Sequence, residues 1–396
     1  MYFYLALIIA VRRYLCIMKT IFFISPNGFP SKNNRNVGIF TLEQAKALEK
    51  GKNPILIDLA TNKKSEIYSE KFDGVTIYRI PYAKYNLLKI CKNFFFLKKL
   101  IIKYDPELII CSFLNLRNFI YTHFLNVEKT IIIHGTDAVV CNIFVKFLYY
   151  LFLSKIKKII VVSNYTKQVF LQSFKRKFFK EKVLVIQNGI SINKLKLKNK
   201  KFHKNIPSKR TIISCVANFV TRKNIPFLIK VFNYLNSRNP QKYHLIIAGG
   251  RGNEENKIKE TIQMHKLKNN ISVMQNLLNS EISALLNKSN FFCLFSKKQK
   301  NEFEGFGIVF IEAMYTKNIV FTSKHGAIEE IVKNNFNGFS FDLEKPNIIE
   351  KIVKQIEFIN KNNSYKKMII NNAFNYSLNF SWKKNINKIL NECLKK

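Results

Sequence analysis

The segment NEFEGFGIVFIEAM (301–314) combines two carboxylates with a glycine-rich turn. Its chemically suggestive residues are two glutamates and the turn that follows the first of them: Glu304, Glu312, Gly305, Phe306, Gly307 and Ile308. A glycine turn that leads into a helix exposes backbone N–H groups at the positive end of the helix dipole. The segment therefore predicts an anion site suited to a diphosphate.

The spacing of the two glutamates separates their tasks. Glu304 and Glu312 are eight residues apart, or about two helical turns, so they cannot hold the same phosphate. Facing a sugar nucleotide, they would accept hydrogen bonds from hydroxyl groups, one on the ribose side and one on the transferred sugar. The alternative is an ordinary strand, turn and helix with two surface carboxylates.

A basic loop gives a second signal, in the segment ANFVTRKNIPFLIKVF (217–232). Arg222 and Lys223 follow an apolar run and come just before an amphipathic helical pattern. Two adjacent cations in such a loop could clamp a diphosphate and stabilise a departing nucleotide. Taken alone, the pair also fits a solvated basic loop.

A histidine at the end of an apolar run gives the third signal. In IIIHGTD (131–137), His134 comes directly after the run, beside a glycine and three residues before Asp137. A histidine at the carboxyl end of a strand would point toward a ligand site. The alternative is a histidine that serves only the structure.

The apolar runs of the sequence predict the strands and helices that would position these residues. Strand-like runs alternate with helical patterns from residue 20 to 189 and again from 211 to 342. Buried apolar strands that alternate with helices predict parallel α/β sheets. Between them lies a basic, non-periodic stretch (194–210), which is typical of a linker between domains. Ligands of such folds bind beyond the carboxyl ends of the strands.

At this point the chain resembles glycosyltransferase family 4. EGFGIVFIEAM is similar to that family's Glu-x7-Glu signature almost residue for residue, and the likeness is strongest over 211–342. The resemblance implies an α/β, GT-B fold: two facing Rossmann-like domains with the active site in the cleft between them. It implies an N-terminal acceptor domain (18–195), a C-terminal donor domain (205–378) and a last helix (380–396) that packs back on the first domain.

The resemblance also implies roles for individual residues. Glu312 matches the glutamate that binds the ribose, and Glu304 matches the one that contacts the donor sugar. Lys223 matches a phosphate-binding lysine, and His134 matches the histidine near the donor sugar or the acceptor. Gly38 matches a glycine near the donor phosphate. The expected catalytic residues are thus Glu304, His134 and Lys223; Arg222, Gly38 and the turn residues join the donor-binding set.

The chain also departs from the family pattern. Asn218 stands where the family often has an arginine, which Arg222 would replace. Lys317-Asn318-Ile319 replaces the usual Gly-x-Pro turn. The following Gly-Gly element is His325-Gly326, with Glu330 matching the glutamate downstream. These changes concern the identity of the donor sugar, and His325 is a candidate for tuning it.

The charge of the chain limits the kinds of partner that it is expected to bind. The 396 residues carry 66 Lys+Arg against 25 Asp+Glu, a net charge of +41, which attracts polyanions. We find no nucleic-acid-binding motif, so we expect an anionic membrane surface and no nucleic acid. The helical pattern at 87–106 suits a membrane interface. For 142–158 we expect a buried helix with a solvated basic face.

The cysteines and the N-terminal residues add no candidate for the site. Seven scattered cysteines predict neither a disulfide framework nor a zinc site, and they suggest a reducing compartment. The apolar stretch within residues 1–17 is too short to span a membrane. We expect translation to begin at Met18; the alternative is a short membrane-dipping anchor.

Together these features predict a retaining glycosyltransferase of the hexosyltransferase type. It would transfer a sugar from a nucleotide-sugar donor to a glycan or lipid-linked acceptor in surface polysaccharide or glycolipid biosynthesis, such as that of lipopolysaccharide. We expect a cytoplasmic enzyme, peripheral on the inner face of the membrane, that needs no cofactor and no metal. Two alternatives stay open: a nucleotide-sugar epimerase on the same fold, and a non-catalytic scaffold of glycan assembly.

Overall fold

The computed structural model describes residues 19–31, 37–60, 66–83, 86–174, 179–196, 207, 209–250, 252–299 and 301–395. The chain forms two compact units: residues 1–189 with 382–396, and residues 190–381. Residues 1–17 and most of the basic stretch expected as a linker lie outside the described residues.

The first unit is built on an eight-stranded sheet with the order β3-β4-β2-β1-β5-β6-β7-β8. Its strands are β1 (Lys19–Ser25), β2 (Lys52–Asp58), β3 (Tyr68–Phe72), β4 (Val75–Arg79), β5 (Pro106–Ser112), β6 (Lys129–Ile133), β7 (Lys158–Val161) and β8 (Val183–Val185). All neighbours are parallel except β3 and β4. The central strands are runs of Ile, Leu and Phe buried on both faces, as a parallel sheet covered by helices requires.

The antiparallel β3–β4 hairpin departs from the all-parallel sheet that the sequence predicts. Asp73 and Gly74 form its two-residue turn, with φ of 51° and 83°. Positive φ at both central positions matches the twist of a tight hairpin, and an Asp-Gly pair adopts it readily. The hairpin extends the sheet at the edge beyond β2.

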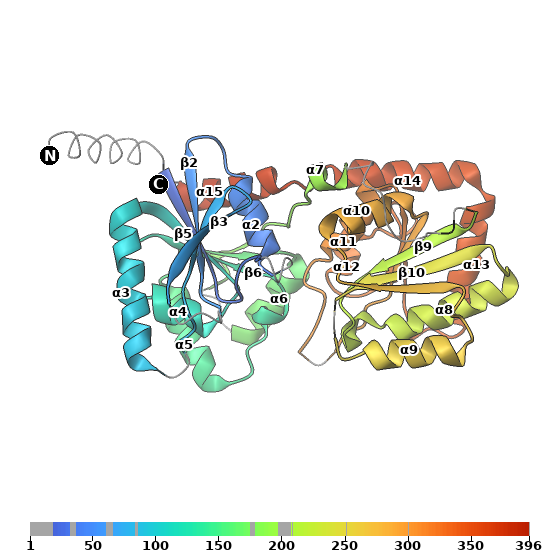
Figure 1. Cartoon of the computed structure of the whole chain (residues 1–396), viewed down its shortest axis with the longest axis horizontal. Coiled ribbons are helices and arrows are strands. Elements are labelled where there is room, and N and C mark those ends of the chain that lie inside the picture. The colour runs from blue at the N-terminus through green and yellow to red at the C-terminus, as the bar shows by residue number, and fades with distance from the viewer. Residues whose placement is uncertain are drawn as a thin grey trace. The chain divides into compact units, whose positions relative to one another are not determined.

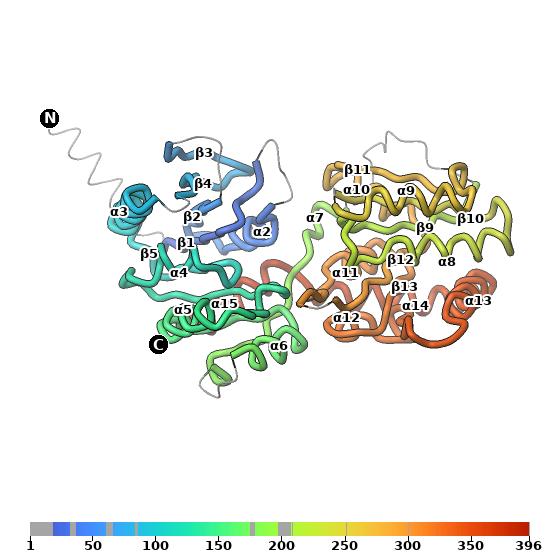
Figure 2. Tube along the Cα trace, turned by 90° about the horizontal axis from the view of Figure 1, so that it is seen from below, coloured from blue at the N-terminus to red at the C-terminus, as the bar shows by residue number. Residues whose placement is uncertain are grey.

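Helices cover both faces of this sheet (Figures 1 and 2). They are α2 (Ile39–Lys46), α3 (Leu87–Tyr104), α4 (Leu116–Thr122), α5 (Ile143–Ser154), α6 (Asn164–Phe174) and α15 (Trp382–Leu394). The crossover through α2 runs toward β2, and those through α3 to α6 run the opposite way along the sheet. Right-handed crossovers therefore put α2 on one face and α3 to α6 on the other. The C-terminal α15 packs against α2 and β7.

The expectation of a buried helix at 142–158 is wrong in part. α5 buries Tyr149, Phe152 and Leu153, but Ile143 and Phe144 are exposed to 83% and 65%. The helix is apolar almost all round, and a sheet can cover only one side of it. Among the described residues, no helix is long and apolar enough to cross a membrane.

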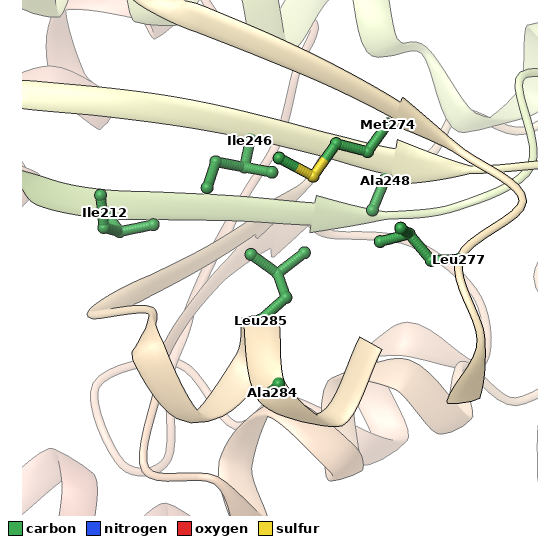
Figure 3. Packing of buried hydrophobic residues seen from close by; sticks show 7 residues of the cluster. All are labelled: Ile212, Ile246, Ala248, Met274, Leu277, Ala284 and Leu285. Atoms are coloured by element: carbon green, nitrogen blue, oxygen red, sulfur yellow. The ribbon is translucent and has the colours of Figure 1, made fainter. Parts of the chain in front are cut away.

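The second unit has a six-stranded parallel sheet with the order β11-β10-β9-β12-β13-β14. Its strands are β9 (Thr211–Val216), β10 (Tyr243–Gly249), β11 (Ile271–Gln275), β12 (Phe291–Leu294), β13 (Ile319–Ser323) and β14 (Phe339–Phe341). Figure 3 shows part of its core, where Leu285 of a covering helix points at Ile246 and Ile212 of the sheet. These side chains are at most 3% exposed.

The helices of the second unit cover this sheet. They are α7 (Ile192–Leu195), α8 (Ile225–Arg238), α9 (Glu255–Met264), α10 (Asn279–Lys288), α11 (Ile308–Tyr315), α12 (Ile328–Ile331), α13 (Ile348–Lys361) and α14 (Asn363–Ser377). α7 contacts α10, where Asn287 Nδ2 donates to the carbonyl oxygen of Leu195 at 3.0 Å. The boundary defined by contacts therefore falls after Gly189, six residues before the expected domain end at 195.

Candidate active site

The glycine-rich turn joins the loop after β12 to the first turn of α11. Gly307 is the N-cap residue of α11 and has a left-handed backbone, with φ of 86°. A Cβ atom there would lie 2.7 Å from the ring of Phe310, so the turn needs glycine. Among the described residues no side chain caps this helix, but the N–H of Phe310 donates to the carbonyl oxygen of Gly307 at 3.0 Å, so only the N–H groups before Phe310 could bind an anion.

Glu304 binds both cations of the basic loop. Its Oε2 atom lies 2.6 Å from a guanidinium nitrogen of Arg222 and 2.5 Å from Nζ of Lys223. All three side chains are less than a fifth exposed. Burial alone would raise the pKa of the Glu304 carboxyl, but Lys223 and Arg222 outweigh it and lower the pKa to about 2. Glu304 is therefore ionised at neutral pH.

Backbone hydrogen bonds fix the loop after β9 that carries Arg222 and Lys223. Both residues lie in a short 3-10 turn, η3 (Thr221–Lys223). The carbonyl oxygen of Arg222 accepts a hydrogen bond of 2.8 Å from the N–H of Lys297, in the loop that leads from β12 to Glu304. Asn253 Oδ1 accepts the N–H of Thr221 at 3.2 Å. The two loops that carry the opposite charges are thus tied together through their main chains.

The other predicted residues of this unit follow in the same turn and helix. Gly305 and Phe306 are buried, and the Phe306 ring lies 6.0 Å from that of Phe380. Ile308 and Glu312 are half-buried in α11. α11 begins only at Ile308, so Glu312 lies one turn into the helix while Glu304 precedes it. The carboxylates therefore occupy different elements, as two separate tasks require.

His325 joins this neighbourhood, close enough to Glu304 and Arg222 for both charges to act on it. Burial lowers the pKa of the ring, so His325 is neutral at pH 7. Its Nε2 lies 2.7 Å from the carbonyl oxygen of Ser296 and must donate the proton to it. Nδ1 of this tautomer is then an acceptor.

His134 belongs to the first unit, directly after β6. Asp137 accepts its backbone N–H at 2.9 Å and that of Gly135 at 2.8 Å. Burial lowers the pKa of the His134 ring to about 4, so it is neutral, and burial raises the pKa of Asp137 to about 6. Both ring nitrogens of His134 are shielded from solvent and have no hydrogen-bond partner among the described residues.

Gly38 lies at the N-cap of α2, with φ of 62°. A Cβ atom there would lie 2.2 Å from the carbonyl oxygen of Gly28, so two backbone segments touch at this point. Phe40, in the first turn of α2, has its ring 6.0 Å from that of His134. Gly38 and His134 are thus held on neighbouring segments of the first unit.

A buried ion pair that the sequence analysis missed supports the loop before Gly38. Arg79 binds the carboxylate of Asp58 and donates to the carbonyl oxygens of Phe29, at 3.0 Å, and Pro30. Asp58 and Arg79 are 5% and 4% exposed. Both follow apolar strand residues, and their register across β2 and β4 could have suggested the pair only after the strand order was known.

Groups of three or more metal-ligating side chains are absent from the residues that the structure describes. The chemistry that the second unit offers is instead that of a charged, partly buried anion site. Arg222, Lys223 and Glu304 lie in the loops that follow β9 and β12, next to the N-terminus of α11, and Glu312 lies one turn into that helix. Such a site suits a phosphorylated ligand with hydroxyl groups.

The chain is similar to known glycosyltransferases. Residues 197–376 match the family model for glycosyl transferases, group 1. An uncharacterized glycosyltransferase of Methanocaldococcus jannaschii is 26% identical over 265 residues, which are 66% of this chain and 66% of the relative.

Solved structures resemble the whole chain. A glycosyltransferase of Rickettsia africae has a TM-score of 0.75 at 23% identity and covers 96% of this chain and 99% of its own. Anabaena HepE, solved with UDP and glucose, has a TM-score of 0.71 at 16% identity, over 95% and 99%.

The two Rossmann-like sheets therefore have the GT-B fold of glycosyltransferases, as the sequence predicted. The residues that match the model for glycosyl transferases, group 1, all lie in the second unit, which is therefore similar to the domains of that family.

Proposed function

We propose that this protein transfers a sugar, with retention of configuration, from a nucleoside diphosphate sugar to a glycan or lipid-linked acceptor. The observation that carries the proposal is the pairing of Glu304 with Arg222 and Lys223. The cluster provides two cations for a diphosphate and a carboxylate for a sugar hydroxyl, in the same loop system as the open N-terminus of α11.

In this proposal, each group of the second unit has one task. Arg222, Lys223 and the first amides of α11 bind the diphosphate and stabilise the charge that develops as it leaves. Glu312 accepts hydrogen bonds from the ribose, and Glu304 accepts them from the transferred sugar. Because the cations supply the neutralisation that a metal would supply, we expect transfer without a metal ion.

The first unit contributes a neutral histidine. His134 presents one N–H donor and one acceptor nitrogen, both without a protein partner among the described residues. Because both nitrogens are shielded from solvent in this structure, a sugar hydroxyl can bond to either one only after the groups that cover the ring move aside. UDP in complexes of similar folds, such as that of Anabaena HepE, supports a nucleotide-sugar donor for this chain.

We further propose that α3 and α5 dock the enzyme on an anionic membrane, where lipid-linked acceptors are found. Leu88 and Ile102 on α3 and Ile143 on α5 are each more than 80% exposed. Exposed lysines accompany them, and the chain has a net charge of +41. Apolar side chains beside lysines suit an anionic lipid surface. The enzyme would then be peripheral, on the cytoplasmic face, and serve surface polysaccharide or glycolipid biosynthesis.

A thermal-shift panel of UDP-, GDP- and ADP-sugars, without metal, tests the donor site. A ligand at a hundred times its Kd stabilises a protein by about 2.7 kcal/mol. We expect one nucleotide class to raise the Tm of the wild type and of a surface control, Glu344→Ala, but not of Glu312→Ala. If no nucleotide shifts the wild type, the transferase proposal loses its basis and a scaffold becomes the better explanation.

Product analysis separates transfer from epimerisation. A transferase releases the free nucleoside diphosphate only as the sugar moves to an acceptor, with its anomeric configuration retained. An epimerase converts the donor sugar with no acceptor present. Turnover of the donor alone into an isomeric nucleotide sugar would contradict the proposed function.

A further inference from the structure

Phe113 has a backbone conformation that its side chain disfavours. It directly follows β5 and has φ of 66°, in the left-handed region. Bulky residues rarely adopt this region, where glycine or asparagine fits with little strain. Strained residues persist where the surrounding structure fixes them, and they gather at functional sites.

Hydrogen bonds on both sides hold Phe113 in this conformation. Its N–H donates to the carbonyl oxygen of Ile132 at 2.8 Å, and its carbonyl oxygen accepts from Asn118 Nδ2 at 2.9 Å. Asn118 is fully buried and also donates to the carbonyl oxygen of Ser112 at 2.9 Å. The loop is thus fixed from the strand beside it and from the helix after it.

The strained backbone brings the Phe113 ring against His134. The two ring centroids are 4.6 Å apart, with an angle of 41° between the planes, and Phe40 lies 6.0 Å from the same histidine. Asp137 joins the two loops, because it accepts the N–H of His134 and, at 3.2 Å, that of Leu114. The histidine is therefore positioned through its main chain and through its ring.

We propose that Phe113 is a positioning residue, which holds the ring of His134 in the orientation that a substrate sugar requires. The proposal rests on the function proposed above, in which His134 meets a sugar hydroxyl. An unstrained glycine or asparagine would satisfy the loop but leave one side of the histidine ring without contact. Phenylalanine supplies this ring contact, at the cost of backbone strain.

The positioning role of Phe113 is tested by replacing it with residues that tolerate the same left-handed backbone. Phe113→Asn and Phe113→Gly keep the left-handed loop but remove the ring, and Phe113→Tyr keeps the ring. Misplacement of a catalytic group by about 1 Å can slow a reaction by roughly a hundredfold. We expect kcat of the first two variants to fall by about tenfold to a hundredfold, with an unchanged Kd for the nucleoside diphosphate. Phe113→Tyr should have the kcat of the wild type. Lys266→Gly, which relieves a positive φ at an exposed site of the second unit, is the matched control and should leave kcat unchanged.

An NMR titration of His134 gives a readout that needs no transferase activity. The resonance is assigned by its loss in His134→Gln. The carboxylate of Asp137 contacts the backbone N–H of His134. The cause that lowers the pKa of the His134 ring to about 4 is burial. Removal of the Phe113 ring should hydrate the imidazole and raise its pKa toward the ordinary 6.5. A pKa that stays at about 4 in both Phe113→Asn and Phe113→Gly, or wild-type kcat in these variants, overturns the positioning role. If the wild type shows no transferase activity, that result would count against the proposed function alone.

Discussion

Lys223 Nζ lies 2.5 Å from Oε2 of Glu304, and Arg222 binds the same oxygen atom at 2.6 Å. One carboxylate oxygen thus binds both cations that the proposed function assigns to the donor diphosphate, and the single negative charge of Glu304 offsets one of their two positive charges. A diphosphate that binds Arg222 and Lys223 must share them with Glu304 or displace it. Glu304 therefore competes with the nucleotide while it serves the sugar, and these two effects can be separated by mutation.

Glu304→Gln should bind the free nucleoside diphosphate more tightly than the wild type and transfer sugar more slowly. The amide removes the competing charge but keeps a side chain of the same shape. A charged hydrogen bond is worth about 1.5–3 kcal/mol, so a tenfold or larger change in affinity is expected. Isothermal titration with the nucleotide and steady-state kinetics with the nucleotide sugar measure the two effects. Glu344→Gln, at an exposed site, is the control. Weaker nucleotide binding in Glu304→Gln would show that no such competition exists.

Stability at acid pH should depend on the same carboxylate. The pKa of Glu304 is lowered from 4.5 to about 2, so its ionised form favours the folded state. This contribution, of about 3 kcal/mol at most, is complete above pH 4.5 and is lost as the pH falls toward 2. Urea unfolding of the wild type and of Glu304→Gln should therefore converge between pH 4.5 and 2. Parallel curves over that range would contradict the lowered pKa.

The sequence predicted the parallel sheets because their strands are unbroken apolar runs, which periodicity detects. It missed the β3–β4 hairpin, although Asp73-Gly74 is a strong hairpin signal. Tyr68–Phe72 alternates between half-buried and exposed positions and contains Ser and Lys, so it lacks the apolar signal of the other strands. The error at α5 has the opposite origin, since an apolar helix does not reveal which of its sides the sheet covers.

The motifs located the chemically interesting residues, but not their partners. Glu304 follows Arg222 by 82 residues, and no spacing rule predicts that both cations meet one oxygen atom. The pairing of Asp58 with Arg79 likewise depends on the register of β2 and β4. The strain at Phe113 has no sequence signal, because phenylalanine is among the residues least expected at a positive φ.

Gly38→Ala should destabilise the first unit more than a positive φ alone explains. The added methyl group would lie 2.2 Å from the carbonyl oxygen of Gly28, and backbone atoms at both segments would have to move. Gly51→Ala is the matched control, because Gly51 has φ of 93° and nothing within 4 Å of the added atom. We expect a loss of about 1–2 kcal/mol in the control and about 1–3 kcal/mol more in Gly38→Ala. Urea unfolding measures both, and equal losses would show that the close approach to Gly28 is not rigid.

Membrane binding should depend on the exposed apolar residues of α3 and α5. Leu88→Glu and Ile143→Glu each replace a side chain that is more than 80% exposed, so neither should weaken the fold. Burial of such a side chain in lipid is worth about 1.5–3 kcal/mol, and each variant should lose about tenfold or more in partitioning to vesicles that contain phosphatidylglycerol. Met264→Glu on α9, where Met264 is 75% exposed, adds the same charge in the second unit and should bind like the wild type. The wild type should also bind less as salt rises, since lysines contribute part of the attraction. Equal partitioning of all four proteins would show that the apolar residues of α3 and α5 do not enter the bilayer.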